Sequence, residues 1–232
     1  MSDEKHILII VTAHAVFGQT GEKTGLWFEE LSTPYYAFID HGARVDLVSL
    51  PGGPVPIDPR SLATEGRNPA SVERFLKDQA AMDQLLNSRK LSDVSVEDYQ
   101  AVFIPGGHGA MWDLAASREL GDFLSAAWAG GAVLASVCHG PAGLVNARDS
   151  QGRPLVAGRK VGAFSNSEEA QMKLSEVVPF LLETRLRQLG ADYQSGPDFE
   201  PFVVRDGRLI TGQNPASSKK VADLLLEALD EQ

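Results

Sequence analysis

Residues 131–141 read Gly131-Ala132-Val133-Leu134-Ala135-Ser136-Val137-Cys138-His139-Gly140-Pro141. The first seven of these residues are small, apolar and partly β-branched, which predicts a short strand buried on both faces. Gly140 and Pro141 suit a tight bend followed by a first helical turn, because proline lacks the N–H that would stay unpaired there. The stretch therefore predicts a strand–turn–helix corner with Cys138 at its apex, the geometry of a nucleophile elbow.

Cys138 is the only cysteine of the chain, so an internal disulfide is excluded. A thiol at such a corner lies near converging backbone N–H groups and the positive end of a helix dipole, which lower its pKa and favour the thiolate. A lone cysteine is equally compatible with a small apolar core residue. The pattern predicts a reactive Cys138 only if its neighbours can support that chemistry.

The rest of the chain alternates predicted strands and helices. Apolar runs predict strands at 6–11, 43–50, 101–104 and 161–164, and helical periodicity predicts helices at 25–41, 69–89, 120–129, 177–189 and 214–229. Asp206-Gly207 indicates a late hairpin. The alternation predicts an α/β fold: an open, mostly parallel sheet with helices on both faces. Ligands bind such sheets outside the carboxyl ends of the strands, where Cys138 is expected.

Length and composition predict a single α/β domain over residues 1–232, with a cap-like excursion at about 51–90. Lys and Arg total 21 against 31 acidic residues, a net charge of −10, and no basic stripe is present. This charge disfavours nucleic acid and anionic membranes as partners. The charged segment 1–5 and the short apolar run after it predict neither a signal peptide nor a membrane span. We therefore expect a soluble, cytoplasmic protein.

His139 follows Cys138 directly, and its imidazole can approach the thiol at an elbow. A third group would be needed to orient that imidazole. Glu168 and Glu169 are candidates, since they follow the predicted strand end at Phe164 and lie on the same rim. Either carboxylate could instead be a first-turn residue that complements a helix dipole. The residues alone leave both interpretations open.

Glu30 lies in a predicted helix rich in aromatic residues. A carboxylate there is ordinarily exposed, but one turned toward the elbow could share a proton with the thiol. The turn 106–109 (Gly-Gly-His-Gly) lets backbone N–H groups approach a substrate oxygen, yet it lacks the spacing of a phosphate or dinucleotide loop. The five histidines show no pair at metal-ligand spacing. We expect neither a cofactor nor a metal.

Three motifs together resemble the ThiJ/PfpI superfamily, whose members have a flavodoxin-like (Rossmann-like), glutamine-amidotransferase-like fold. They are Pro105-Gly106-Gly107-His108-Gly109, Ala135-Ser136-Val137-Cys138-His139-Gly140-Pro141 and Asn214-Pro215-Ala216-Ser217. The segment Gly25–Leu31 and the extra region Pro51–Arg89 look like its heat-shock chaperone and glyoxalase III branch. The resemblance covers nearly the whole chain.

The resemblance implies roles for individual residues. The family's nucleophile falls on Cys138, its histidine on His139 and its elbow-facing glutamate on Glu30. Its third triad member falls on Glu169, with Glu168 one position away. The backbone amides of Gly107 and His139 match the family's oxyanion hole, and family members are usually homodimers.

The resemblance further implies a lyase that needs neither glutathione, cofactor nor metal. It would convert methylglyoxal into D-lactate through a hemithioacetal on Cys138, with deglycase or holdase-chaperone activity also found in the branch. Three alternatives remain. They are a cysteine peptidase or amidase that uses the same two residues, a non-enzymatic stress chaperone, and a sensor in which Cys138 is oxidised reversibly.

Overall fold

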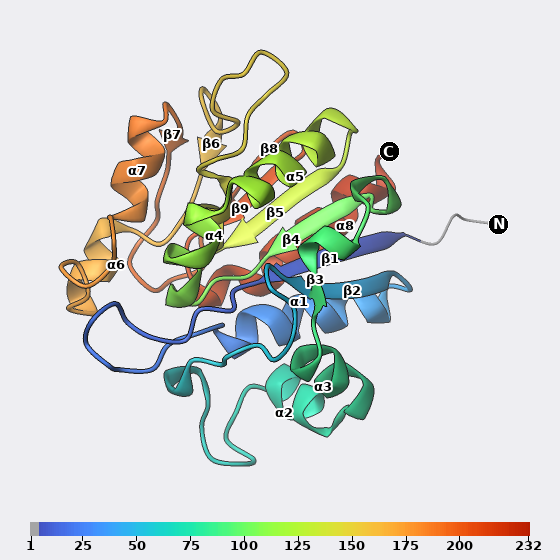
Figure 1. The fold of residues 1–232 in the computed structure, drawn as a ribbon, viewed down its shortest axis with the longest axis vertical. Coiled ribbons are helices and arrows are strands. Elements are labelled where there is room, and N and C mark those ends of the chain that lie inside the picture. The colour runs from blue at the N-terminus through green and yellow to red at the C-terminus, as the bar shows by residue number, and fades with distance from the viewer. Residues whose placement is uncertain (1–4) are drawn as a thin grey trace.

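The computed structural model describes residues 5–232, and a seven-stranded sheet runs through its middle in the order β3-β2-β1-β4-β5-β9-β8 (Figure 1). Neighbouring strands are parallel except β8, which is antiparallel to β9. The strands are β1 His6–Val11, β2 Arg44–Ser49, β3 Arg89–Lys90, β4 Ala101–Ile104, β5 Val133–Val137, β8 Val203–Asp206 and β9 Leu209–Gly212, and a separate pair is formed by β6 Lys160–Val161 and β7 Asp192–Tyr193. The predicted open, mostly parallel sheet is confirmed.

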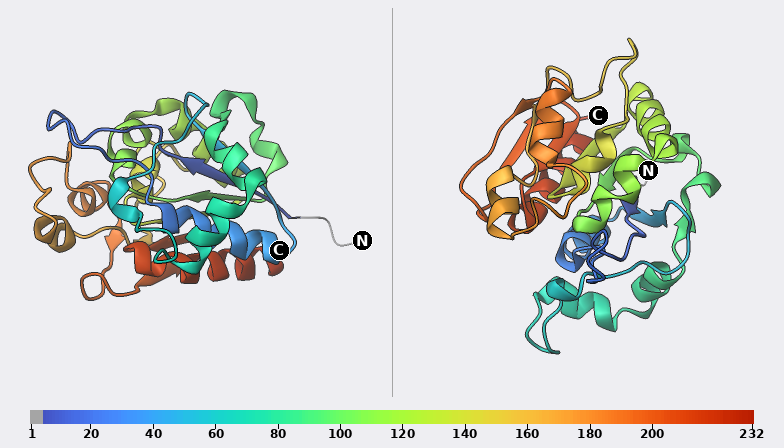
Figure 2. Two further views of the ribbon diagram at one scale, coloured as in Figure 1. Left: turned by 90° about the horizontal axis from the view of Figure 1, so that it is seen from below. Right: turned by 60° about the vertical axis from the view of Figure 1, so that its left-hand side comes forward.

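Helices cover both faces of this sheet (Figure 2). On one face lie α1 and α8, and on the other lie α4 and α5. The helices are α1 Phe28–Asp40, α2 Ala70–Lys77, α3 Gln79–Leu86, α4 Asp113–Ala116, α5 Arg118–Ala129, α6 Asn166–Gln171, α7 Leu182–Gln188 and α8 Ser218–Asp230.

The interior strand β1 shows why both faces of the sheet must be covered by helices. Ile7 and Ile9 pack into the core under α1 and α8, whereas Leu8 and Ile10 pack into the core under α5. Because successive side chains of a strand point to opposite faces, an unbroken apolar run fills both cores at once. All four side chains are fully buried.

Several predicted elements are shorter than the sequence pattern indicated, and the strand predicted at 161–164 is confined to β6, outside the main sheet. The helix predicted at 69–89 is wrong as one element: it divides into α2 and α3 at Asp78, whose carboxylate accepts a hydrogen bond from the Ala81 N–H and caps α3. The helix predicted at 177–189 is confined to α7, Leu182–Gln188. Pro179 accounts for the loss, since it lacks an N–H and disfavours helical backbone in the residue before it.

The topology brings three chain segments to one edge of the sheet. Because β4, β5 and β9 are parallel, the residues after Ile104, Val137 and Gly212 all leave the sheet at its carboxyl edge. The predicted excursion at 51–90 contains α2 and α3, which lie beside α1 at the lower end of Figure 1. The assignment of residues 1–232 to a single domain stays a prediction. Within residues 5–232, no helix is long and apolar enough to cross a membrane.

Candidate active site

Cys138 lies directly after β5 in a left-handed backbone conformation, with φ of +61°. Such a conformation is uncommon outside glycine and is maintained only where the surroundings impose it. Here the Cys138 N–H donates to the Gly212 carbonyl oxygen and the Cys138 carbonyl accepts from the Phe164 N–H, both at 2.9 Å. A Cβ on Gly140 would lie 2.1 Å from the Ile104 carbonyl oxygen, so only glycine fits the bend. The predicted elbow is present, and its thiol is buried.

The imidazole of His139 bridges the thiol and a carboxylate. Its Nδ1 atom lies 3.3 Å from Cys138 Sγ, and its Nε2 atom lies 2.7 Å from Oε2 of Glu169. Both His139 and Glu169 are buried. Burial alone would raise the pKa of Glu169, but the two neighbouring imidazoles, His139 and His108, hold that pKa well below its ordinary value. Glu169 is therefore ionised and can orient His139.

Glu168, the other acidic candidate, serves a different part of the molecule. Its carboxylate accepts hydrogen bonds from the backbone N–H of Ser165 and of Phe199, and from the side-chain amide of Asn214. Ser165 in turn caps α6 by accepting from the Glu168 N–H, which completes a capping box. Glu168 thus ties three chain segments together, and it is Glu169 that contacts His139.

Glu30 is fully buried on α1 and faces the elbow. Its Oε2 atom accepts a 2.6 Å hydrogen bond from the Gly106 N–H, and its Oε1 atom has no partner of standard hydrogen-bond geometry within residues 5–232. Burial raises the pKa of Glu30 to about 8, although contacts with the Cys138 thiol and the Gly106 N–H lower it in part. At neutral pH Glu30 is mainly a carboxylic acid that can offer its proton to the sulfur.

The expectation of a low thiol pKa at Cys138 is wrong. Burial, followed by the charge of Glu30, raises the pKa of Cys138 well above its ordinary value, and the N–H of His139 lowers it only in part. The segment after His139 is a five-residue 3₁₀ turn, Gly140–Leu144, rather than a long α-helix. A short turn contributes little of the dipole that would favour a thiolate. The resting thiol is therefore neutral, and forming the thiolate requires a base.

Gly107 and His139, the two residues expected to supply oxyanion-hole N–H groups, both line the cavity beside the thiol. Gly107 has a φ of +88°, and a Cβ there would lie 2.1 Å from the Gly25 carbonyl oxygen, so the turn requires glycine. Within residues 5–232, neither Gly107 nor His139 donates its N–H to a backbone carbonyl outside the regular elements. Gly106 packs against the His139 nitrogen, which brings the two turns together.

The side chain of His108 also reaches this site, which the sequence interpretation did not anticipate. His108 follows Gly107, and its Nε2 atom lies 2.7 Å from Oε1 of Glu169. The two residues are 61 positions apart, so no spacing rule could have linked them. Ligand atoms of His108, His139 and Glu169 lie within 4.8 Å of one another, a grouping that could hold a metal ion. The expectation that the protein needs no metal stays a prediction.

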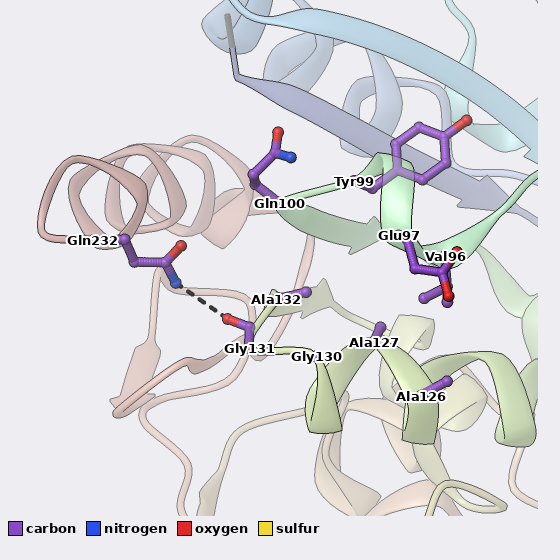
Figure 3. A pocket seen from close by; sticks show the side chains of 10 residues that line it. All are labelled: Val96, Glu97, Tyr99, Gln100, Ala126, Ala127, Gly130, Gly131, Ala132 and Gln232. Atoms are coloured by element: carbon purple, nitrogen blue, oxygen red, sulfur yellow. Dashed lines mark hydrogen bonds between the residues drawn. The ribbon is translucent and has the colours of Figure 1, made fainter. Parts of the chain in front are cut away.

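A cavity of about 140 Å³ opens onto the thiol and is lined almost entirely by apolar atoms. Its walls are Trp27, Gly107, His108, Cys138, His139, Phe164, Met172, Phe199 and Pro215. A larger cavity of about 390 Å³ lies at the opposite edge of the sheet, before β4 and β5, where Gln232 donates to the Gly131 carbonyl (Figure 3). Its lining includes Glu97 and Tyr99 but no nucleophile or histidine. The small cavity is therefore the candidate active site.

Comparison with known proteins finds relatives that cover nearly the whole chain. The DJ-1/PfpI family model matches residues 26–228. The chain is 32% identical to the glutathione-independent glyoxalase HSP31 of Saccharomyces cerevisiae, over 99% of each chain. It superposes on the Rapid Encystment Protein 24 KDa of Francisella tularensis with a TM-score of 0.93 at 38% identity, covering 97% of this chain and 99% of that one. Glyoxalase III from Candida albicans gives a TM-score of 0.88 at 28% identity, over 97% of each chain.

Proposed function

The chain belongs to the DJ-1/PfpI family, and on that premise we propose that it is a glutathione-independent glyoxalase that converts methylglyoxal into D-lactate. Similarity to a glyoxalase over the full length supports the assignment. The observation that carries the chemistry is the line of contacts from Cys138 through His139 to Glu169 at the floor of a small apolar cavity.

In the first step, we propose, the Cys138 sulfur attacks the aldehyde carbon of methylglyoxal. The Nδ1 atom of His139, 3.3 Å from Sγ, accepts the thiol proton as the S–C bond forms. A base is needed because the buried thiol has a raised pKa. Glu169 stabilises the resulting imidazolium, as a buried carboxylate does for a catalytic histidine. The aldehyde oxygen becomes an alkoxide, to which His139 passes the thiol proton, and this gives a hemithioacetal and a neutral His139.

The next steps move one electron pair and two protons within the substrate. One proton passes from the former aldehyde carbon to the former ketone carbon, and the hydroxyl proton of the hemithioacetal passes to the former ketone oxygen. His139 removes the proton from the former aldehyde carbon, and the electron pair passes into an enediolate. Protonation of the former ketone carbon then gives a thioester of lactic acid. The aldehyde carbon is oxidised and the ketone carbon is reduced, so no external redox partner is required. Water hydrolyses the thioester, releases lactate and restores the thiol.

The substrate oxygen that becomes negatively charged in these steps needs hydrogen-bond donors to stabilise it. We propose that the N–H groups of Gly107 and His139 supply them, as a rigid oxyanion hole whose dipoles are fixed before the reaction. Glu30 is proposed to act as a neutral acid that holds the sulfur through its proton. Its raised pKa, about 8, keeps that proton in place at neutral pH.

The cavity favours a small, uncharged substrate. The nine residues that line it include no lysine, arginine or carboxylate, and Cys138 is 4% exposed. A polypeptide segment has no room to lie across this thiol, which argues against the peptidase or amidase alternative. Deglycase and holdase activities and a homodimeric state stay proposals that rest on the family resemblance, and the cytoplasmic location expected from the sequence stays a proposal.

The experiment is an assay for D-lactate formed from methylglyoxal in glutathione-free buffer. Cys138→Ala is expected to abolish the reaction. Ser136→Ala is the matched control: Ser136 is buried two residues earlier in β5, and its hydroxyl has no hydrogen-bond partner within the described chain. Turnover that persists in Cys138→Ala would contradict the proposed function, and so would wild-type protein that forms no D-lactate.

A further inference from the structure

The carboxylate of Glu169 is shared between two imidazoles. Oε2 faces His139 Nε2 and Oε1 faces His108 Nε2, each at 2.7 Å. The two rings lie 4.0 Å apart between centroids, and both residues are buried. The mechanism above uses only one of these imidazoles, so the second needs an explanation.

The tautomer of His108 follows from its other neighbour. Its Nδ1 atom lies 3.3 Å from Nη2 of Arg60. A guanidinium can only donate hydrogen bonds, so Nδ1 must be the unprotonated, accepting nitrogen of the ring. In a neutral imidazole the proton is then on Nε2, where it can be donated only toward Glu169.

Arg60 is itself held in place by Asp58, which lies two positions earlier in the chain. Its Nε atom donates to Oδ1 of Asp58 and its Nη2 atom to Oδ2, and Asp58 is fully buried. The Thr24 hydroxyl also donates to Asp58, and the guanidinium packs 4.5 Å above the Phe17 ring. The bidentate geometry fixes the direction in which Arg60 points its remaining N–H groups. Arg60, which belongs to the excursion at 51–90, is thus linked to the Glu169 carboxylate through His108.

We infer that His108 is a positioning residue, a neutral imidazole that donates Nε2–H to Glu169 and leaves the other carboxylate oxygen free to hold His139. Arg60 is the residue that sets its tautomer. The inference rests on the proposed function, because it deepens the role of the same site. Burial, and then the neighbouring His139 charge, lower the pKa of His108 to about 4. A neutral His108 can therefore keep donating its Nε2–H to Glu169 while His139 takes part in proton transfer.

The experiment compares two substitutions at one position. His108→Leu removes the donor while keeping a side chain of similar size, and His108→Gln retains an N–H near the place of Nε2. We expect His108→Leu to lower kcat by about 10-fold to 100-fold, as loss of a supporting partner of a functional histidine does. KM should change little, and His108→Gln should recover most of kcat.

Nitrogen NMR of the histidine side chains supplies a readout that is independent of glyoxalase turnover. With ¹⁵N-labelled histidine, wild-type His108 is expected as the Nε2–H tautomer between pH 5.5 and 8. Arg60→Met should mix the two tautomers and raise the pH at which His108 titrates. Arg74→Met is the control, because Arg74 forms a comparable bidentate pair with Asp40 in the same region but contacts neither histidine.

The outcomes separate the inference from the proposed function. An Nδ1–H or cationic His108 at pH 7, or a His108→Leu variant with wild-type kcat, would overturn the inference. So would a His108→Gln variant as impaired as His108→Leu. Should the wild-type protein form no D-lactate, the proposed function fails, but the NMR tautomer and its response to Arg60→Met still decide the role of His108. If His108→Leu does not fold, the NMR tautomer of His108 in the wild-type protein and in Arg60→Met decides the inference.

Discussion

Glu168 and Glu169 are neighbours in the chain and both are buried, yet their carboxylates share no partner. Glu169 contacts two imidazoles of the candidate active site. Glu168 contacts neither imidazole and instead accepts hydrogen bonds from two backbone N–H groups and one side-chain amide. The separation follows from helix geometry, because consecutive side chains on α6 point about 100° apart. Glu169 is thus positioned to act on the imidazoles, whereas Glu168 stabilises the surrounding backbone.

Glu169→Gln should therefore lower turnover, whereas Glu168→Gln should lower stability. Glu169→Gln should lower kcat for methylglyoxal by about 100-fold or more, because an amide cannot stabilise the His139 imidazolium. Glu168→Gln should keep most of its turnover while folded but lose about 2–4 kcal/mol of stability, since an amide cannot accept all three hydrogen bonds. A first-turn dipole role alone predicts a loss of only about 0.3–1 kcal/mol for Glu168. Assays of D-lactate and urea unfolding measure the two effects.

The thiol of Cys138 should react slowly with iodoacetamide at neutral pH. Because burial and Glu30 raise its pKa, the rate of alkylation should increase with a midpoint above about 8.5, the value of a free cysteine. In Glu30→Gln the midpoint should be lower, since the repelling carboxylate charge is gone. A wild-type midpoint near neutral pH would show instead that the thiolate is preformed.

Glu30 should make the stability of the protein fall as pH rises. Its pKa is about 8 in the folded protein against an ordinary value of 4.5. A raised folded pKa gives a contribution that is fully present below pH 4.5 and lost as pH rises toward 8, because the unfolded chain ionises first. Glu30→Gln should thus be more stable than wild type at pH 9, by on the order of a few kcal/mol, but not at pH 4.5. Urea unfolding at both pH values tests this, and D-lactate assays should show reduced turnover.

Gly107→Ala should disrupt the turn that carries one proposed oxyanion donor. A Cβ there would lie 2.1 Å from the Gly25 carbonyl oxygen, so the backbone must shift and turnover should fall by about 100-fold, as for loss of one oxyanion donor. Gly42→Ala is the control, because Gly42 has a similar φ of +84° with nothing within 4 Å of the added Cβ. The control should lose only about 1 kcal/mol of stability and keep its turnover. Equal loss of activity in both variants would contradict the assignment.

Phe199 should limit the size of the substrate. It lines the cavity, is 43% exposed and has a φ of +61°, with its N–H held by Glu168. Phe199→Ala should raise kcat/KM for phenylglyoxal relative to methylglyoxal by about 10-fold or more, as expected when an apolar pocket is enlarged. Leu62→Ala, an exposed apolar residue outside the cavity, is the control. An unchanged ratio in Phe199→Ala would place the size limit elsewhere.

The elbow could be predicted from sequence because its requirements are local. An apolar β-branched run, a lone cysteine and a Gly-Pro pair specify a strand, an apex and a bend within eleven consecutive residues. The alternation of strands and helices is similarly local, and it was enough to predict the sheet. The same pattern does not fix an element's end where a single residue decides it, as Asp78 does between α2 and α3.

The electrostatics of the site depended on burial, which no local pattern reveals. The sequence correctly places a thiol at a corner, but the low pKa inferred from a helix dipole is wrong because the following turn is short and Glu30 is buried beside the sulfur. A carboxylate on an aromatic-rich helix looks exposed by default. Only the packing of α1 against the elbow removes Glu30 from water and raises its pKa to about 8.

By itself, the sequence determined the fold class, the apex at Cys138 and the adjacent His139, because each depends on residues next to one another. Tertiary structure alone decided that Glu169 holds two imidazoles while Glu168 holds a loop. It also placed Arg60, from the excursion, beside His108. These contacts join residues 30 to 61 positions apart. Parallel strands bring such residues together at one edge of the sheet, and hydrogen bonds between buried charged and polar groups then fix their directions.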